Sequence, residues 1–550
     1  MKRRSFLTKI LLLVLILCSV FVLASCNAEE PEEEPTGDSV EEECSHTFGD
    51  WTVTKEALCE DGSRERICTK CQEKEVQILD ATQDHVYGEW TIVKKSSCQN
   101  GEERRKECKT CDLVIKDTSE EKGYHDYEDY TCTFCGLEAS KGLEYTLSED
   151  KTYYILCGIG ECKDENIVVL DTYEELPVKV IKASAFEGNI TIKDISIPET
   201  VEEIGANAFK GCTAIINFVV PESVTKIGEA VFDGCVSLES ITLPFVGAEK
   251  DGTENTHFGY IFGAKTADAN NSSIPDKLKS VNLVGAESIS AFAFNGCSKL
   301  TSIELGEELK TIGNAAFADC DGLTRIVLPS GVKEISQMAF YGCDALSSVS
   351  LPDDCLEKIS AYAFYNCEKL GSITIPKSVK SISDSAFKNC KALVTVAFSG
   401  TELVNIGASA FEGCVSIQKL TFSEGLESIG DSAFAGCKML NSIVFSSTIT
   451  GIGDFAFSNC EELVELKVPK NVTIIGDSAF SGCIKLEIIS FDMGSKIAVI
   501  EDNAFSGCSA LLKIAYSGTQ KAWGEVNKGD KWDDNTGDYV LECSDDDVTE

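Results

Sequence analysis

From about residue 180 onward the chain repeats itself every 23 to 25 residues, and this period limits the folds that are open to it. The repeated pattern is Ala-Phe-x-Gly-Cys-x-x-Leu-x-x-Ile-x-Leu-Pro-x-x-Val-x-x-Ile-Gly. A unit this short cannot bury its apolar side alone, whereas a stack of units can. The sequence therefore predicts a solenoid with one coil turn per repeat. The Phe of the pattern recurs at 13 positions, which are Phe186, Phe209, Phe232, Phe294, Phe317, Phe340, Phe364, Phe387, Phe411, Phe434, Phe457, Phe480 and Phe505.

The run Leu323-x-x-Ile326-x-Leu328 shows how one turn is built. Alternation of apolar and polar residues predicts a short strand whose Ile and Leu face inward, and strands of successive turns pair in parallel. The expected fold class is an α/β-type solenoid, a right-handed leucine-rich-repeat coil with a parallel β-sheet, preceded by small Cys/His-stapled modules. The Ile429-Gly430 and Ile475-Gly476 steps are expected at tight bends, where Gly tolerates a positive φ.

A Cys follows the Phe by three residues in twelve of the turns. One Cys per turn, with no His or carboxylate in phase, does not make a tetrahedral metal site. The pattern instead indicates a small buried side chain whose S–H donates to a backbone carbonyl. These residues are Cys212, Cys235, Cys297, Cys320, Cys343, Cys367, Cys390, Cys414, Cys437, Cys460, Cys483 and Cys508.

On the Phe-x-Gly-Cys-x-x-Leu-x-x-Ile-x-Leu-Pro pattern, the long turn between Phe232 and Phe294 and the Trp-rich terminus, the chain resembles the BspA-type leucine-rich-repeat surface lipoproteins of bacteria. The resemblance covers about 400 residues. It implies a curved solenoid and a role in attachment to host proteins or to other cells, and it supplies no catalytic residues. The chain departs from the pattern at Gly188-Asn189, Ser336, Ser360 and Ser383.

The N-terminal residues have the features of an export signal. A basic start and an apolar run over residues 10–23 lead to Leu23-Ala24-Ser25-Cys26, which resembles a bacterial lipobox. The sequence predicts a lipoprotein signal peptide over residues 1–25 and lipid attachment at Cys26, so that the protein is anchored to a membrane without spanning it. Residues 26–43 contain eight Glu and two Pro and are expected to form an acidic, disordered tether.

Residues 44–139 contain Cys/His repeats, similar to zinc ribbons, with a period of about 40. Each unit is too small to hold a core without a staple. The spacing is compatible with a structural Zn²⁺ in each full unit, and disulfides are the alternative in an oxidising compartment. A shortened third unit retains His125, Cys132 and Cys135. The candidate metal ligands in the two full units are His46, Cys59, Cys68, Cys71, His85, Cys98, Cys108 and Cys111.

Three further segments complete the expected organisation. Residues 140–180 read as strands that cap the first coil, with Cys157 and Cys162 near enough in sequence to pair. The solenoid itself is expected over residues 181–515, and a C-terminal cap with an acidic tail over 516–550. The irregular stretch 247–275 is either an over-long surface loop or a binding loop. Its candidate binding residues are His257, Phe258, Tyr260 and Phe262.

Charge and side-chain chemistry restrict the function. With 49 basic and 90 acidic residues the formal net charge is −41, which argues against nucleic acid as a partner. The outward strand positions of the repeats are small and hydroxylic, and they offer no constellation for catalysis and no small-molecule substrate site. We expect a non-enzymatic adhesion lipoprotein, extracellular at the bacterial cell surface, whose partner is a host or neighbouring-cell protein. The alternative is a structural spacer or metal-holding lipoprotein.

Overall fold

The computed structural model describes residues 48–55, 62–79, 86–87, 89–94, 98, 101–109 and 114–545. The expected signal peptide, Cys26 and the tether lie outside these ranges and stay predictions. No helix among the described residues combines the length and the apolar character needed to cross a membrane. The chain divides into two compact units, Met1–Val93 with Glu103–Asp117, and Lys94–Glu102 with Thr118–Glu550.

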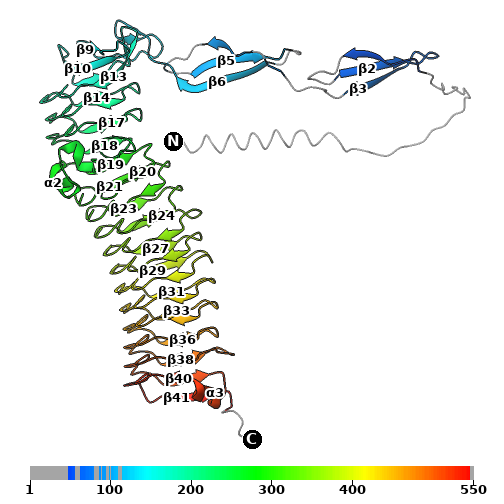
Figure 1. Cartoon of the computed structure of the whole chain (residues 1–550), viewed down its shortest axis with the longest axis vertical. Coiled ribbons are helices and arrows are strands. Elements are labelled where there is room, and N and C mark those ends of the chain that lie inside the picture. The colour runs from blue at the N-terminus through cyan, green and yellow to red at the C-terminus, as the bar shows by residue number, and fades with distance from the viewer. Residues whose placement is uncertain are drawn as a thin grey trace, which may run out of the picture. The chain divides into compact units, whose positions relative to one another are not determined.

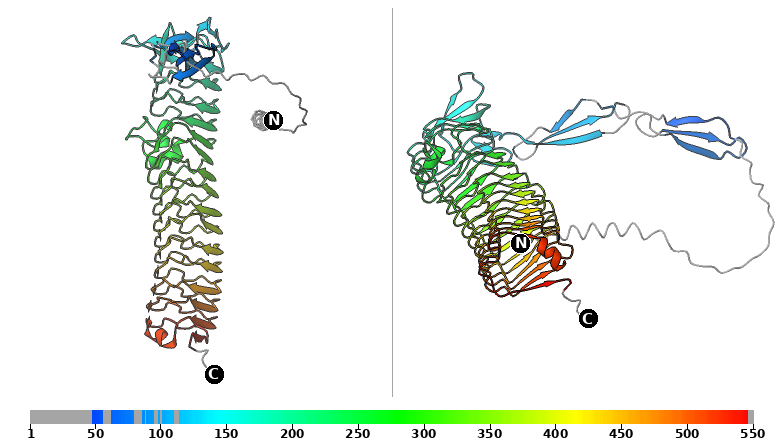
Figure 2. Two further views of the ribbon diagram at one scale, coloured as in Figure 1. Left: turned by 90° about the vertical axis from the view of Figure 1, so that its right-hand side faces the viewer. Right: turned by 60° about the horizontal axis from the view of Figure 1, so that its bottom comes forward.

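The second unit contains a parallel-sheet solenoid with little helix, as Figure 1 shows. The Leu-x-x-Ile-x-Leu run of each repeat forms one strand, and these strands align along one side of the coil (Figure 2). They are β14 (Asp194–Ser196), β16 (Asn217–Val219), β18 (Ser240–Leu243), β19 (Ser280–Leu283), β21 (Ser302–Leu305), β23 (Arg325–Val327), β25 (Ser348–Ser350), β27 (Ser372–Ile375), β29 (Thr395–Phe398), β31 (Lys419–Thr421), β33 (Ser442–Val444), β35 (Glu465–Val468), β37 (Ile488–Phe491), β39 (Lys513–Tyr516) and β41 (Val540–Cys543).

The Ile of each Ile-Gly step ends a second, shorter strand in almost every turn, so the coil has two ladders of parallel strands. In the longest of these sheets nine strands, from β24 to β40, follow one another in order. The second ladder comprises β13 (Leu176–Ile181), β15 (Glu203–Ile204), β17 (Lys226–Ile227), β20 (Ser288–Ile289), β22 (Thr311–Ile312), β24 (Glu334–Ile335), β26 (Lys358–Ile359), β28 (Ser381–Ile382), β30 (Asn405–Ile406), β32 (Ser428–Ile429), β34 (Gly451–Ile452), β36 (Ile474–Ile475), β38 (Val499–Ile500) and β40 (Asn527–Lys528).

The strand alternation predicted from the sequence is confirmed. In β23, Ile326 is buried while Arg325 and Val327 on either side of it are exposed. The parallel register places equivalent apolar residues of successive turns side by side, as Ile373 of β27 and Val396 of β29 show. Burying one such side chain contributes about 1.5–3 kcal/mol. The contribution accrues only when neighbouring turns cover each other, so the stack supplies the core that one repeat lacks.

The Phe residues of the repeats form a stacked aromatic column inside the coil. The rings of Phe364 and Phe387 are 5.1 Å apart between centroids with an interplanar angle of 9°, and those of Phe387 and Phe411 are 5.0 Å apart at 5°. Each of these side chains is fully buried. The column follows from the period, because one Phe at the same phase of every turn places one ring above the next.

The cysteine ladder is explained by packing, as the sequence predicted. All twelve ladder cysteines have an exposed fraction of 0%. The Sγ of Cys343 donates to the carbonyl of Phe317 in the preceding turn at 3.1 Å, and that of Cys367 does so to Phe340 at 3.2 Å. Burial raises the pKa of Cys212 to about 12, although a backbone hydrogen bond opposes the shift. The Cys212 thiol therefore stays protonated and acts as a small apolar side chain.

The expectation of a positive φ at the Ile-Gly steps is wrong. Gly430 and Gly476 are absent from the left-handed region, which is occupied instead by residues such as Gly211 (φ 72°) and Ser432 (φ 55°). Gly430 is needed because a Cβ there would meet the backbone nitrogen of Ala408 in the preceding turn at 2.8 Å. The constraint is close approach between turns, and some turns relax it, because Ser occurs at this position in four of them.

The long turn at 247–275 is a packed insertion. It contains η1 (Phe258–Phe262), η2 (Ala267–Ala269) and α2 (Asn270–Ser273). Phe258 and Phe262 are buried at 0% and 2% exposure, and the Phe258 ring continues the aromatic column 5.0 Å from Phe294. His257 is 7% exposed and its Nε2 lies 3.2 Å from the carbonyl of Ala264. The binding-loop interpretation is thus corrected for these three residues, whose side chains fill the core; Tyr260 is only partly buried.

Both ends of the coil are covered. At the N-terminal end β9 (Glu144–Leu147) pairs antiparallel with β10 (Tyr154–Gly158), and β10 pairs in parallel with β13. β11 (Asn166–Val168) pairs in parallel with β14, and β12 (Thr172–Tyr173) pairs with β13. The cap strands thus extend both ladders. Cys157 and Cys162 are not disulfide-bonded, and the Cys157 thiol instead lies 3.2 Å from the hydroxyl of Thr146.

The C-terminal cap continues the coil past residue 515, the end expected for the solenoid. β40 pairs with β38 and β41 with β39, so both ladders gain a strand. Between β39 and β40, α3 (Gln520–Glu525) carries Trp523, which is 8% exposed. Its ring lies 5.5 Å from Phe491 and 6.2 Å from Trp532. Trp532 in turn lies 6.2 Å from Phe505, the last ring of the column, so aromatic side chains cover the C-terminal end of the column.

The Cys/His modules are small antiparallel sheets. The first contains β1 (Thr52–Lys55), β2 (Gly62–Ile67) and β3 (Lys74–Leu79), and the second contains β4 (Thr91–Lys94), β5 (Gly101–Glu107) and β6 (Val114–Lys122). Arg64 and Arg66 lie 4.8 and 4.6 Å from the ring centroid of Trp51. In this small sheet, cation–aromatic contacts take the place of the apolar packing that a larger domain would have. The third module reduces to β7 (Tyr127–Glu128) paired with β8 (Thr131–Cys132).

Candidate functional site

Three thiols and one imidazole converge beside the N-terminal cap of the solenoid. They belong to Cys98, His125, Cys132 and Cys135, and one ligand atom from each lies within 4.8 Å of all the others. Cys132 is buried, Cys98 and His125 are half-buried, and Cys135 is exposed. All four residues belong to the unit that contains the solenoid. Three sulfurs and one ring nitrogen form a donor set that Zn²⁺ prefers in closed, four-coordinate sites.

The turn that carries Cys132 and Cys135 is fixed by its backbone. Gly136 has a φ of 75°, and its N–H donates to the carbonyl of Cys132 at 2.9 Å. The first module repeats this turn, since Gln72 has a φ of 65° and its N–H donates to the carbonyl of Cys68 at 3.0 Å. In both turns the residue after Cys-x-x-Cys takes the left-handed conformation, which closes the turn and brings its two Cys together.

The position of Cys98 corrects one predicted ligand set. We expected Cys98 to join His85, Cys108 and Cys111 of its own module. Cys98 instead lies in the segment between β4 and β5, whereas Cys108 follows the far end of β5. An extended strand of seven residues covers about 23 Å, so the two cannot share an ion. The Sγ of Cys98 lies 3.6 Å from that of Cys132.

Several predicted ligands remain untested. His46, Cys59, His85 and Cys111 lie outside the described residues, so the set of the first module stays a prediction. Among the described members, Cys68 is buried and Cys71 is exposed in the turn described above. In each module the aromatic residue two positions after the His pairs through its backbone with the first Cys of the Cys-x-x-Cys turn. Phe48 forms an antiparallel β-bridge with Cys68, Tyr87 forms one with Cys108, and Tyr127 pairs with Cys132. The three modules therefore share the same backbone pairing next to the Cys-x-x-Cys turn.

A buried carboxylate orients the imidazole. The Oδ2 of Asp171 lies 3.0 Å from Nδ1 of His125 and also accepts the His125 backbone N–H at 2.6 Å. The Asp171 side chain is 6% exposed, and its Oδ1 is buried with no hydrogen-bond partner. Asp171 comes from the solenoid cap, just before β12, so the cap itself holds the His125 ring. The sequence carried no signal for this residue, which stands alone at a strand edge.

Hydrogen bonds shift the pKa values of two of the thiols in opposite directions. Burial raises the pKa of Cys98 to about 12, and its hydrogen bonds to Cys132 and Cys135 act in the same direction. Burial also opposes ionisation of Cys132. The backbone N–H groups of Cys135 and Phe134, together with the neighbouring thiols, outweigh it and lower the pKa of Cys132 to about 7. A sulfur that accepts two amide hydrogen bonds is thus held ready to carry negative charge.

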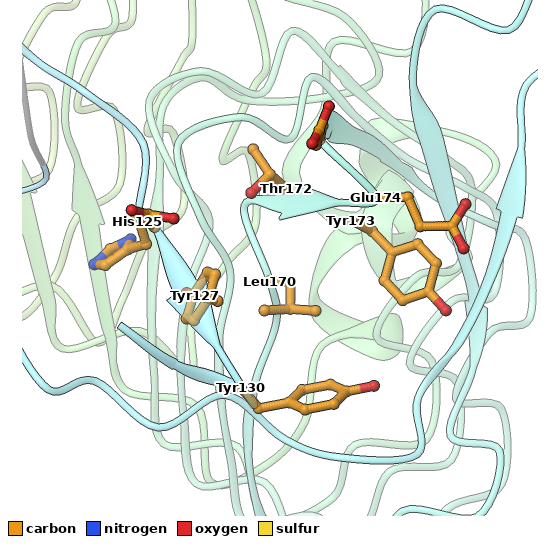
Figure 3. Close-up of a pocket in the computed structure, with 9 residues that line it drawn as sticks. His125, Tyr127, Tyr130, Leu170, Thr172, Tyr173 and Glu174 are labelled. Atoms are coloured by element: carbon orange, nitrogen blue, oxygen red, sulfur yellow. The ribbon is translucent and has the colours of Figure 1, made fainter. Parts of the chain in front are cut away.

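A shallow hollow of about 380 Å³ adjoins the cluster (Figure 3). Tyr127 and Tyr130 of the third module face Leu170 and Tyr173 of the cap across it. In this view the imidazole of His125 lies at the margin and is directed away from Tyr130 and Tyr173. The hollow is lined by aromatic rings and by the acidic residues Asp126, Glu174 and Glu175.

The outward strand face of the solenoid is the second candidate site. Its residues stand in rows across successive turns, since Ser372 lies beside Thr395 and Thr395 beside Lys419. All of the outward side chains from β27 to β31 are exposed, and most carry hydroxyl groups. The flanks of the coil instead carry turn-to-turn ion pairs, such as Lys380–Glu357 at 2.8 Å. Such exposed pairs add little stability. On the strand face from β25 to β33 the one charged outward side chain is that of Lys419.

Comparison with known proteins concerns the repeat region. A family model for the BspA-type leucine-rich-repeat region matches residues 171–252, 270–394 and 404–525, which is more than half of the chain. The chain is similar to the structure of a leucine-rich repeat protein from Bacteroides ovatus, at 25% identity over 73% of this chain and 98% of that one, with a TM-score of 0.46. It is also similar to a leucine rich cell surface protein from Faecalibacterium prausnitzii, at 22% identity over 74% and 99%, with a TM-score of 0.31. No curated protein matches the sequence.

Proposed function

Because the chain belongs to the BspA-type leucine-rich-repeat family, we propose that it is a bacterial cell-surface protein whose solenoid binds a protein of a host or of a neighbouring cell. The N-terminal lipobox pattern at Leu23–Cys26 supports lipid anchoring of the mature chain at Cys26. The acidic segment that follows would then project the solenoid from the membrane. In this proposal the molecule binds its partner and catalyses no reaction.

The outward strand face is the observation that carries the proposal. Its side chains are mostly Ser and Thr, whose hydroxyl groups both donate and accept hydrogen bonds. The backbone beneath them is held by parallel pairing on both sides and by the buried aromatic column. A rigid face loses little conformational entropy when it binds, so modest contacts per turn add up over many turns. These properties suit a broad contact with another protein better than a deep ligand site.

Isolated apolar side chains on the same face provide candidate anchor points. Val327 is 45% exposed, Val444 is 49% exposed and Val219 is 57% exposed, each at an outward strand position. Apolar residues surrounded by small polar ones are typical of the energetically important centre of an interface and its rim. We therefore place the contact along the strands of β23 to β33, because Val327 lies on the first of them and Val444 on the last.

The test is saturable binding of the labelled full chain to two probes, an epithelial-cell monolayer and intact cells of a second bacterial species. The face variant carries Ser372→Arg, Thr395→Arg and Thr421→Arg. A matched control adds the same charge away from the strands at exposed positions, through Met439→Arg, Ile484→Arg and Met493→Arg. We expect binding of the face variant to weaken at least tenfold, about 1.4 kcal/mol or more, while the control stays near the unmodified chain.

Two results would contradict the proposal. Equal weakening by both variants would show that charge alone controls the binding. Absence of saturable binding to both probes would leave the alternative, a structural spacer or metal-holding surface lipoprotein without a specific adhesive role. Unfolding curves of both variants by circular dichroism serve as the folding control.

A further inference from the structure

We propose that Cys98, His125, Cys132 and Cys135 bind one Zn²⁺ ion, which joins the tip of the β4–β5 hairpin to the third module and to the cap of the solenoid. The inference concerns a metal site and does not depend on what the strand face binds. The four donors come from two segments distant in sequence, and Asp171, from a third, holds the imidazole. The proposed ion is thus a cross-link between parts of the chain that share no strand.

The sulfur separation fits a shared metal ion. Two sulfurs bound at about 2.3 Å to one tetrahedral ion are about 3.8 Å apart. The Sγ atoms of Cys98 and Cys132 are 3.6 Å apart. A disulfide would need about 2.05 Å. Three thiols cannot in any case pair among themselves without leaving one over, whereas a metal uses all three together with the imidazole.

Asp171 is the positioning residue of the site. Its carboxylate occupies Nδ1 of His125, which leaves Nε2 as the ring nitrogen available to the ion. A carboxylate on the far nitrogen of a ligating His fixes the tautomer and strengthens the ligand. The buried Oδ1 of Asp171 has no hydrogen-bond partner, so this carboxylate is incompletely compensated by its surroundings. A cation on the other side of the imidazole would offset part of the cost of burying that charge.

Four protein donors close the coordination sphere, so the site has no open position for a substrate and is structural. Its mechanical role follows from the segments that it ties. Cys98 lies between β4 and β5. His125 precedes β7, Cys132 ends β8 and Cys135 follows it, while Asp171 precedes β12. The third module has only four residues in strands. A sheet of that size is not stable alone, and the ion supplies the missing constraint.

Metal content of the full chain is the first test. Zinc per chain is measured by mass spectrometry of the purified protein, for the unmodified chain and for Cys98→Ser and Cys135→Ser. Each variant should lose one equivalent of zinc. Cys157→Ser is the matched control, because this half-buried thiol lies in the cap but outside the cluster, and it should lose none. Unchanged zinc content in both cluster variants would overturn the proposal, as would a Cys98–Cys132 disulfide found by non-reducing peptide mapping.

A second measurement separates metal binding from folding. Asp171→Asn should keep the ion but weaken its affinity by about 10–100-fold in competition with a chelator. Removal of zinc should raise hydrogen exchange over residues 123–139 while leaving exchange around Phe387 unchanged. Cobalt substituted into the chain should give the absorption of a tetrahedral thiolate complex, and the charge-transfer band should shrink in Cys98→Ser. Uniform exchange changes along the whole coil, or a cobalt spectrum indifferent to Cys98, would refute the assignment.

Discussion

The aromatic column gives the most quantitative prediction about the coil, and Phe387 is the position to change. This side chain is fully buried and stacks on Phe364 and Phe411 at 5.1 and 5.0 Å. Removing a buried Phe side chain costs about 3–5 kcal/mol. Loss of two aromatic pairs adds about 0.5–1.5 kcal/mol each. We expect Phe387→Ala to destabilise its region of the coil by about 4–8 kcal/mol, and Phe387→Leu, which keeps most of the apolar volume, by about 1–3 kcal/mol.

The assay for Phe387 must be local, because a solenoid of repeats does not unfold as one two-state unit. Native-state hydrogen exchange resolved by peptide reports the opening free energy of each turn. Phe455→Leu is the matched control, since Phe455 is 46% exposed and lies outside the column. Faster exchange should be confined to the turns next to Phe387. If Phe387→Leu and Phe455→Leu had the same effect, or if exchange rose equally in all turns, the stacking account would be refuted.

Two other properties of the coil can be tested from urea unfolding curves. Burial raises the pKa of both Cys212 and Cys235 to about 12. In the unfolded chain such thiols ionise near pH 8.5. Below that pH each buried thiol makes its full contribution to the free energy of unfolding. As the pH rises toward 12 this contribution is lost, at about 1.4 kcal/mol per pH unit for each thiol. Cys212→Ala with Cys235→Ala should flatten the alkaline fall of the urea midpoint followed by circular dichroism; a fall as steep as in the unmodified chain would contradict this. Gly430→Ala should destabilise by about 1–3 kcal/mol, since its Cβ would strike the neighbouring turn. Gly371→Ala, which meets nothing within 4 Å, should stabilise by about 0.4–1 kcal/mol, and equal urea midpoints for the two variants would remove the close-approach argument.

The coil could be predicted from the sequence because its determinants are local and periodic. One Phe and one Cys at fixed phase define the column and the ladder, and strand alternation is visible in any single turn such as Leu323–Leu328. The role of Gly430 could not be read from one turn, since it depends on how closely the next backbone approaches. The long turn at 247–275 was ambiguous for a related reason. Its aromatic residues complete a column whose neighbours lie more than thirty residues away, as Phe258 and Phe294 show.

The Cys/His cluster was only half predictable. The sequence showed that His125, Cys132 and Cys135 occupy the same repeat positions as in the earlier modules. It also showed that modules this small need a metal ion or a disulfide to hold them together. The spacing could not show that Cys98 serves the module that follows it. That assignment depends on the length of β5, which holds Cys98 away from Cys108. Asp171 was also hidden, because it reaches His125 across 46 residues of chain and stands in no repeated pattern.

The central claim, that the outward strand face is the binding surface, is tested most directly by site-specific photocross-linking. A photoreactive amino acid is placed at Thr395 on the face or at Met493 away from it, both of which are exposed. Each protein is bound to epithelial or bacterial cells and irradiated. The account predicts adducts with the same cell-surface protein from Thr395 and none from Met493, and excess unlabelled chain should abolish them. Adducts of equal yield from both positions, or from Met493 alone, would contradict it.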